Sequence, residues 1–382
     1  MSRGSLIYAP IYGTGLGHSY RTAAILEALS SRGHRVVASS WGEGLRYLRF
    51  RGIPCVEVPE LDVVWGGEGK MRFKDTLRNM SSPFARFVNQ VEVEEALIAR
   101  LSPRAVLADS RAAPLVAAKR RGLGAALVIN QARLMAPRAL GALRPAVEVP
   151  FAQALGFLWS LADLVVVPDL PPPYTIAQEQ LSAIPHIRGK LRFVGLPVED
   201  CRGAEPEWLP PRRPFALFTI SGPEETRRPM VMKSLGAARL LARRGWSALI
   251  STADVGERGL REVDDGVYLC GWCGCIDRYM ASADVLVARA GHTTIGKAIY
   301  YGRPSVLLPI PFHGEQESNA LRAQEMGVAR AILRSDLVSE EELADEVEEA
   351  AAMDRGRLER VSAIARSMDL ARLGADAVEE IL

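Results

Sequence analysis

A glycine, a histidine and two threonines stand together at a predicted helix start, in the segment Gly291-His292-Thr293-Thr294. The apolar run 285–288 before it is typical of a buried strand, and Arg289 stands at the turn between strand and helix. Free backbone N–H groups and the helix dipole both favour an anion at a helix start, so the segment predicts a phosphate pocket. Arg289 is either a phosphate contact or an ordinary solubilising charge.

A second polar loop follows the next predicted strand, and its candidate ligands for sugar hydroxyl groups are Glu315, Gln316 and Asn319. A phosphate pocket with such a loop beside it predicts a nucleotide-sugar site. Ser221-Gly222, after the apolar run 215–220, offers a second backbone nest for the anion. The loop that ends at Ile276 either receives a base or is an ordinary strand–helix turn.

A candidate proton acceptor, His18, ends the glycine-rich turn GTGLGH near the N-terminus, where a helix is predicted to begin. The positive end of a helix disfavours the imidazolium, so a neutral ring there could accept a proton. The alternative is a histidine that caps the turn or packs against it. The turn is no dinucleotide fingerprint, because the next strand ends in Ser39-Ser40-Trp41 without an acidic residue.

A candidate partner for this histidine is Asp109, which directly follows the apolar strand 105–108. Its carboxylate is expected at the carboxyl edge of the same sheet as His18, where it could hold the imidazole tautomer and stabilise the protonated ring. It could equally cap the next helix, a role that Ser110 could also take.

The elements that position these residues form two series of alternating strands and helices. The first series, from the strand 5–11 to the strand 191–195, predicts a doubly wound parallel sheet whose ligands bind at the carboxyl ends of the strands. The second series begins at 215–220. We therefore predict an α/β fold with two Rossmann-like doubly wound domains that face each other across a cleft, where a ligand is expected.

Proline content marks the boundary between the two series, because residues 168–211 are the proline-richest part of the chain. We predict a first, acceptor-side domain at 1–197, a hinge at 198–211 and a nucleotide-sugar-binding domain at 212–362. A C-terminal helix within 363–382 is expected to pack back toward the first domain.

Composition sets the class of protein and its partners. The chain has 382 residues and a net charge of +2, so nothing in its charge indicates nucleic acid as a partner. No leader or spanning segment is found, and we expect a cytoplasmic protein. Basic and apolar residues alternate within 70–87 and again within 133–144. These two patches suit either a membrane surface with anionic lipid or a surface helix with snorkelling cations.

Five cysteines occur, and three of them lie close together as Cys270, Cys273 and Cys275. An odd number without a leader argues against a disulfide framework. A zinc site would need a second pair of ligands at suitable spacing, which is missing nearby. We therefore expect small buried or loop cysteines and no metal.

These residues together resemble the GT-B nucleotide-sugar glycosyltransferases, in the MurG-like and UDP-glucuronosyltransferase-like branch, over nearly the whole chain. The motifs that carry the resemblance are GxGxGHxxR, VVPD-PPP, VGLPV, TISGP, ADVLVARAGHTTI and P-HGEQ-SNA. The resemblance implies that His18 is the catalytic base with Asp109 as its partner, and that 291–294 holds the diphosphate. It implies that the donor end is held by Glu315, Gln316 and Asn319, and that the acceptor-side loops contain Gly13, Gly15, Gly17, Arg21, Asn130 and Gln131.

The implied reaction is a direct displacement with inversion that needs no metal and no cofactor, with a UDP sugar as co-substrate. The predicted function is transfer of a sugar, with N-acetylglucosamine as one candidate, to a glycan or lipid-linked acceptor, with peripheral contact at the inner membrane face. Two positions depart from the family: Lys297 replaces a ribose-binding glutamate, and Ile129-Asn130-Gln131 replaces the HEQN of MurG, which argues against the peptidoglycan reaction. The alternatives are an enzyme like UDP-N-acetylglucosamine 2-epimerase and a non-catalytic nucleotide-sugar-binding protein.

Overall fold

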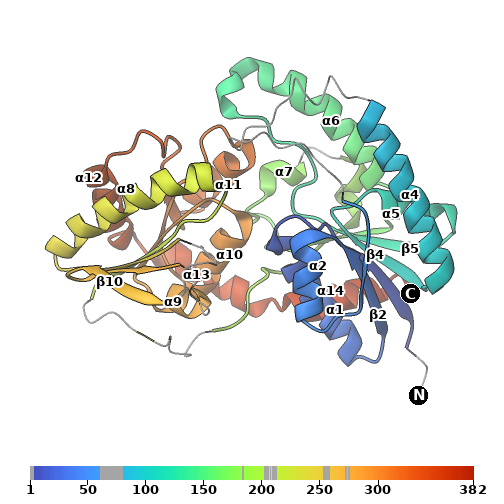
Figure 1. Cartoon of the computed structure of the whole chain (residues 1–382). Coiled ribbons are helices and arrows are strands. Elements are labelled where there is room, and N and C mark those ends of the chain that lie inside the picture. The colour runs from blue at the N-terminus through green and yellow to red at the C-terminus, as the bar shows by residue number, and fades with distance from the viewer. Residues whose placement is uncertain are drawn as a thin grey trace.

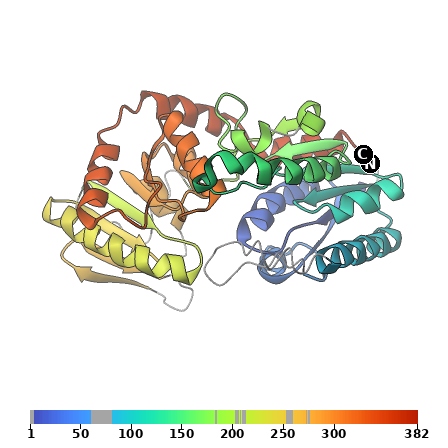
Figure 2. The same cartoon turned by 90° about the horizontal axis from the view of Figure 1, so that it is seen from above.

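The computed structural model describes most of the chain, namely residues 4–60, 81–182, 185–201, 206, 208, 213–252, 259–271, 273 and 276–382. Most of the predicted hinge, 198–211, and most of the first basic–apolar patch, 70–87, lie outside these ranges. The described residues build two seven-stranded sheets that lie side by side with helices around them (Figures 1 and 2). The predicted α/β fold with two doubly wound sheets is confirmed.

The first sheet has the strand order β3-β2-β1-β4-β5-β6-β7, and every neighbouring pair is parallel. Its strands are β1 (Leu6–Pro10), β2 (Arg35–Ser40), β3 (Cys55–Glu57), β4 (Ala105–Asp109), β5 (Gly124–Val128), β6 (Leu164–Val167) and β7 (Leu191–Phe193). Buried apolar side chains fill both faces of the central strands, as a parallel sheet covered by helices requires. Because all strands run the same way, their carboxyl ends share one edge.

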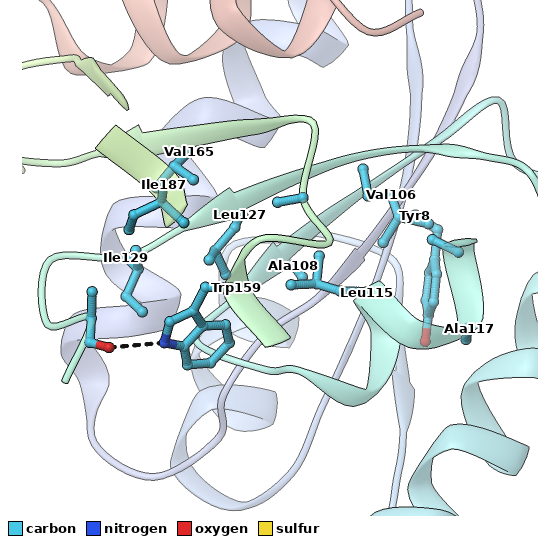
Figure 3. Packing of buried hydrophobic residues seen from close by; sticks show 14 of the residues in the cluster. Tyr8, Val106, Ala108, Leu115, Ala117, Leu127, Ile129, Trp159, Val165 and Ile187 are labelled. Carbon is cyan, nitrogen blue, oxygen red and sulfur yellow. Dashed lines mark hydrogen bonds between the residues drawn. The ribbon is translucent and has the colours of Figure 1, made fainter. Parts of the chain in front are cut away.

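Helices cover this sheet: α1 (Leu16–Ser31), α2 (Gly42–Phe50), α4 (Ser81–Leu101), α5 (Ala113–Arg120), η1 (Arg138–Leu143), α6 (Arg144–Trp159), α7 (Gln178–Ser182) and η2 (Pro185–Lys190). Figure 3 shows the packing on one face, where Leu127, Val165 and Trp159 lie together. The indole N–H of Trp159 donates to the carbonyl of Ala132 over 3.0 Å, which ties α6 to the loop after β5.

The second sheet has the order β10-β11-β9-β8-β12-β13-β14. Its strands are β8 (Phe215–Thr219), β9 (Ser247–Ser251), β10 (Leu260–Asp264), β11 (Val267–Cys270), β12 (Val285–Ala288), β13 (Ser305–Leu307) and β14 (Ala329–Ala331). All pairs are parallel except β10 with β11, which is antiparallel. Strand β10 was not predicted, because its residues are mostly polar and exposed and it pairs only at the sheet edge.

The helices of this half are α8 (Glu224–Arg243), α9 (Ile276–Ser282), α10 (His292–Tyr301), α11 (Gly314–Glu325), α12 (Glu340–Ala351), α13 (Gly356–Ser367) and α14 (Leu370–Glu379). The last of these leaves the second sheet and packs against α1 on the first (Figure 1). The approach is close, since a methyl group added at Gly374 would lie 2.7 Å from the side chain of Ile25. The chain end therefore ties the two halves together.

One expectation about the cysteines is wrong. Cys270 at the end of β11 and Cys273 in the next turn form a disulfide, with Cα atoms 5.9 Å apart. The turn brings the two residues within the separation that a disulfide spans, which the count of cysteines could not show. Cys275 lies outside the described residues.

Candidate active site

Two candidate residues meet at the carboxyl edge of the first sheet, as their positions predicted. Asp109 is the last residue of β4, and His18 lies in the first turn of α1, behind Gly15 with its φ of 76°. His18 Nδ1 and Asp109 Oδ1 are 2.8 Å apart. The His18 side chain is 28% exposed whereas that of Asp109 is fully buried. The imidazole therefore reaches the surface, and the buried carboxylate holds it in place.

The tautomer of His18 follows from its partners. An ionised carboxylate only accepts hydrogen bonds, so Nδ1 donates to Asp109. The guanidinium Nη2 of Arg21 lies farther from Nδ1, at 3.1 Å, and donates to Asp109 Oδ1 over 2.6 Å. Nε2 then carries the lone pair, and this nitrogen can take a proton from a hydroxyl group.

Asp109 accepts further hydrogen bonds besides the one from His18. Arg21 Nε donates to Oδ2 over 2.8 Å, and Thr22 Oγ1 donates to the same oxygen over 2.6 Å. Burial alone would favour the neutral acid, but the positive charge of Arg21 and the hydrogen bonds from Arg21 and His18 outweigh it and hold the pKa of Asp109 below its usual range. The carboxylate is therefore ionised at neutral pH.

The predicted acceptor-side residues divide into two groups. Arg21 is buried and also donates to Asn130 Oδ1 over 2.7 Å, so both residues brace Asp109, in place of the acceptor-side position that we predicted. Gly13 is buried under Trp41, where a methyl group would lie 2.4 Å from the Trp41 carbonyl oxygen. Gly17, next to His18 in the chain, remains partly exposed, and so does Gln131, next to Asn130.

The start of α10 comes close to the start of α1. Gly291 caps α10 in an extended conformation and no side chain caps the free backbone amides, while Thr293 and Thr294 are partly exposed. A methyl group added at Gly17 would lie 3.7 Å from Thr293 Oγ1. The structure thus brings the predicted phosphate pocket of one sheet next to the candidate base of the other.

The side chain of His292, the first residue of α10, contacts the first half of the molecule. It is buried, and its Nε2 lies 2.9 Å from Oδ2 of Asp169, which follows β6 in the first half. Asp169 belongs to the VVPD motif, but no role was predicted for it. The contact of Asp169 with α10 depends on how the two halves pack, and no local sequence pattern predicts that packing.

Arg289 is a correction to the phosphate pocket. The side chain is buried, and its guanidinium donates to the carbonyls of Leu308 over 3.0 Å and Thr226 over 2.7 Å. Burial lowers the pKa of Arg289 to about 10, so it is still a cation at neutral pH. These carbonyls hold it between α8 and β13, and it is not placed as a phosphate contact.

The predicted sugar loop is only partly open. Glu315 is partly exposed at the start of α11, and the Gln316 side chain accepts from the amide of Ile310 over 3.0 Å. Asn319 is fully buried; it accepts from Gln180 over 2.6 Å and donates to the Ala290 carbonyl over 3.3 Å. Asn319 therefore joins α7, α10 and α11, in place of the donor contact that we predicted.

The remaining donor candidates lie on the surface of the second half. Ser221 and Gly222 are exposed, and Gly222 has a φ of 116° that suits a glycine nest. A methyl group at Gly222 would lie 3.5 Å from the side chain of Ile310, beside the sugar loop. Ile276 begins α9 and is partly exposed, whereas Trp272 and residues 274–275 lie outside the described residues.

Lys297 has partners that the sequence did not predict. Its ammonium lies 2.6 and 2.8 Å from the two carboxylate oxygens of Asp277 and 5.2 Å from the ring centre of Tyr20. The cation is therefore held between α9 and α1. This pairing explains how a lysine is accommodated at a half-buried position of α10.

The second basic–apolar patch also needs correction. Arg133 and Arg144 are largely buried and pair with Glu148 and Glu179, while Met135 is buried. The exposed residues of η1 and α6 include Arg138 and Gln153 and five large apolar side chains, Leu140, Leu143, Val149, Phe151 and Phe157. In the part of the chain that is described, no helix is long and apolar enough to cross a membrane, and no cluster of three or more potential metal ligands occurs.

Comparison with protein families assigns both halves of the chain. Residues 5–148 match the description "Glycosyl transferase family 1", and residues 272–373 match "Glycosyltransferase family 28 C-terminal domain". These two ranges contain the His18–Asp109 pair and the start of α10, respectively.

Curated relatives and solved structures agree with this assignment. An uncharacterized glycosyltransferase of Methanosarcina mazei is 27% identical over 334 residues, which cover 84% of each chain. A UDP-N-acetylglucosamine–N-acetylmuramyl-(pentapeptide) pyrophosphoryl-undecaprenol N-acetylglucosamine transferase of Thermus thermophilus is 29% identical over 78% of each chain. The kitacinnamycin glycotransferase structure covers both chains fully with a TM-score of 0.73 at 19% identity, a likeness that shows the fold.

Proposed function

Because the chain is a glycosyltransferase with the GT-B fold, of the MurG-like and UDP-glucuronosyltransferase-like kind, we propose that it transfers a sugar from a UDP-type donor to a hydroxyl group of a lipid-linked acceptor. The Thermus thermophilus relative supports this donor and acceptor class, since its name contains UDP-N-acetylglucosamine and a pyrophosphoryl-undecaprenol. N-acetylglucosamine is the first sugar to test.

The proposed reaction is one displacement. His18 Nε2 takes the proton of the acceptor hydroxyl group, and the oxygen forms a bond to the anomeric carbon while the bond from that carbon to the diphosphate breaks. The bonding electron pair leaves with the diphosphate, whose charge is stabilised by the free amides at the start of α10. A single displacement inverts the anomeric configuration, and this route needs no metal.

One observation carries the proposal, namely the 3.7 Å separation between a methyl group at Gly17 and Thr293 Oγ1. A base and an anion pocket on separate domains could serve unrelated tasks. Here they lie together, so an acceptor hydroxyl at His18 can approach a sugar whose diphosphate lies at α10.

Thermal-shift and calorimetric measurements with UDP, GDP and TDP test the donor first. UDP should bind best, and UDP-N-acetylglucosamine should be consumed only when a polyprenyl-linked acceptor is added, with an inverted product. Failure of every nucleotide to bind would remove the donor site. Release of free UDP without acceptor, accompanied by the 2-epimer of the sugar, would favour the epimerase alternative.

The lipid part of the proposal rests on the outer surface of η1 and α6. Its five large apolar side chains are between 39% and 67% exposed. The only charged residues between positions 139 and 159 are Arg144 and Glu148, which turn inward and bond each other over 2.7 Å. An apolar surface of this kind suits a lipid chain or the edge of a bilayer.

Vesicle flotation tests this surface. Phosphatidylcholine vesicles should retain the protein, and Leu143→Glu with Phe157→Glu should abolish retention, because both side chains are 67% exposed. Met232→Glu is the matched control, since Met232 is 61% exposed on α8 in the other half. Equal retention of all variants by the vesicles would contradict the proposal. Dimerisation of the chain through this face without binding to vesicles would contradict it as well.

A further inference from the structure

Two histidine–aspartate pairs occur among the described residues, and the second, Asp169 with His292, lies outside the reaction proposed above. We propose that Asp169 is a positioning residue for donor binding: it holds His292 as an imidazolium whose Nδ1 donates to the diphosphate. This inference rests on the proposed function, because it takes the start of α10 as the diphosphate site.

Asp169 is built to remain ionised and fixed. The carboxylate is fully buried and receives four hydrogen bonds. Three come from backbone amides, those of Leu170 over 2.7 Å, Ile176 over 3.1 Å and Ala177 over 2.9 Å. The fourth comes from Nε2 of His292 over 2.9 Å. A carboxylate that can only accept fixes the proton of this ring on Nε2.

The other ring nitrogen of His292 is available. Nδ1 makes no hydrogen bond with the described residues, and it is not among their sealed polar atoms that lack a partner. The ring is about 5% exposed. It is the side chain of the first residue of α10, the helix start whose backbone amides no side chain caps.

The other candidate cations near the helix start are paired with protein groups. Arg289 donates to the carbonyls of Leu308 and Thr226, and Lys297 is held by both oxygens of Asp277. Across the junction, the guanidinium of Arg21 is held by Asp109.

Within the described residues, His292 is therefore the side chain best placed to bring a positive charge to a diphosphate. Because Nε2 is bound to the Asp169 carboxylate, Nδ1 can donate to an anion only in the imidazolium, which carries a proton on both nitrogens.

The pair also joins the two halves of the molecule. Asp169 follows β6 of the first sheet, whereas His292 follows β12 of the second. The loop after Asp169 is further held by Arg322 of α11, which donates to the carbonyl of Thr175 over 3.1 Å. A diphosphate that binds His292 would therefore be linked, through this contact, to Asp169 in the acceptor-side half.

Calorimetry with UDP and uridine on the full chain tests the inference. His292→Gln should weaken UDP about 10- to 100-fold, the worth of one charge-assisted hydrogen bond, and leave uridine unchanged because uridine carries no phosphate. Asp169→Asn should weaken UDP similarly, but should have little further effect in a chain that already carries His292→Gln. Thr175→Val is the matched control, because it breaks only a bond within the same loop, from Thr175 Oγ1 to the Leu170 carbonyl.

The outcomes separate this inference from the proposed function. If the unmodified chain binds UDP and His292→Gln does not weaken it, the imidazolium contact is refuted while the donor site stands. Equal losses for UDP and uridine, or a full additional loss from Asp169→Asn in the His292→Gln chain, would show that the pair only holds the halves together. If the unmodified chain binds no UDP, the proposed donor site and this inference both fail.

Discussion

The described part of the chain contains two histidine–aspartate pairs of almost equal length, 2.8 Å for His18–Asp109 and 2.9 Å for His292–Asp169. Both carboxylates are fully buried, and each accepts from one ring nitrogen. The rings differ, because His18 is 28% exposed and His292 is 5% exposed. The more exposed ring of His18 can therefore contact an acceptor, whereas the ring of His292 can contact only a ligand bound at the start of α10.

The second difference lies in the charge around each carboxylate. Asp109 is neutralised by Arg21, which forms two hydrogen bonds with it, whereas Asp169 receives backbone amides and no arginine or lysine among the described residues. A carboxylate that is already paired with a guanidinium adds less stabilisation to an imidazolium. The same two residue types therefore stand in different electrostatic surroundings in the two halves.

The largest expected effect comes from His18→Gln. We expect kcat to fall about 10²- to 10⁴-fold, the usual contribution of a general base, because glutamine cannot take the proton of the acceptor. UDP affinity should not change, since His18 lies on the acceptor side of the junction. Initial rates and calorimetry on the same protein preparation would check this.

A strong loss of UDP affinity in His18→Gln would break the comparison, because it would move His18 into the donor site. Retention of most of the activity would do so as well, by showing that another group removes the proton.

Arg21→Ala is expected to have the next largest effect, this time on folding. It leaves the carboxylate of Asp109 buried without its guanidinium, and such a loss typically costs about 3–5 kcal/mol of unfolding free energy. Urea denaturation would measure it. The control is Arg32→Ala, which removes exposed ion pairs with Asp376 and Glu379 and should cost about 1 kcal/mol or less. Equal losses for the two variants would mean that Arg21 does not set the charge of the first pair.

A matched pair of glycine substitutions probes how the two halves meet. A methyl group at Gly314 would lie 2.4–2.5 Å from the carbonyl oxygens of Ala136 and Met135, whereas one at Gly17 would meet only Thr293 Oγ1 at 3.7 Å. Gly314→Ala should therefore push α11 from the loop after β5 and cost about 1–3 kcal/mol, while Gly17→Ala should be tolerated. Thermal denaturation with and without UDP would test this, and the reverse ranking would contradict the described contacts.

Local signals predicted much of this arrangement. The strand 285–288 and the helix start at Gly291-His292 were predicted as observed, because an apolar run and the glycine turn after it are both local features. The meeting of His18 with Asp109 was also predictable, since the carboxyl ends of parallel strands share an edge.

The partners of the second pair could not be predicted in the same way. Asp169 and Asp277 reach α10 from loops whose paths depend on how the halves pack, and Arg289 is buried only because carbonyls distant in sequence accept its protons. Residue type suggested a phosphate contact at Arg289. Burial and pairing, which belong to the tertiary structure, decided otherwise.

The smallest expected effect sharpens the charge argument for the first pair. Thr22→Val removes the 2.6 Å hydrogen bond to Asp109 and should cost about 1.5 kcal/mol at pH 7. Because the folded-state pKa of Asp109 lies below its ordinary value of 3.8, its ionised form adds stability that is fully present above that pH and is lost as the pH falls through the folded-state pKa. The bond that is lost favours the ionised form, so the difference between Thr22→Val and the unmodified chain should be largest at neutral pH and shrink only as the pH falls through the folded-state pKa, well below 3.8. Urea denaturation from pH 7 down into that acid range measures this difference. A gap that is constant with pH would show that Thr22 does not help to keep Asp109 charged, and that Arg21 and His18 suffice to set the state of this pair.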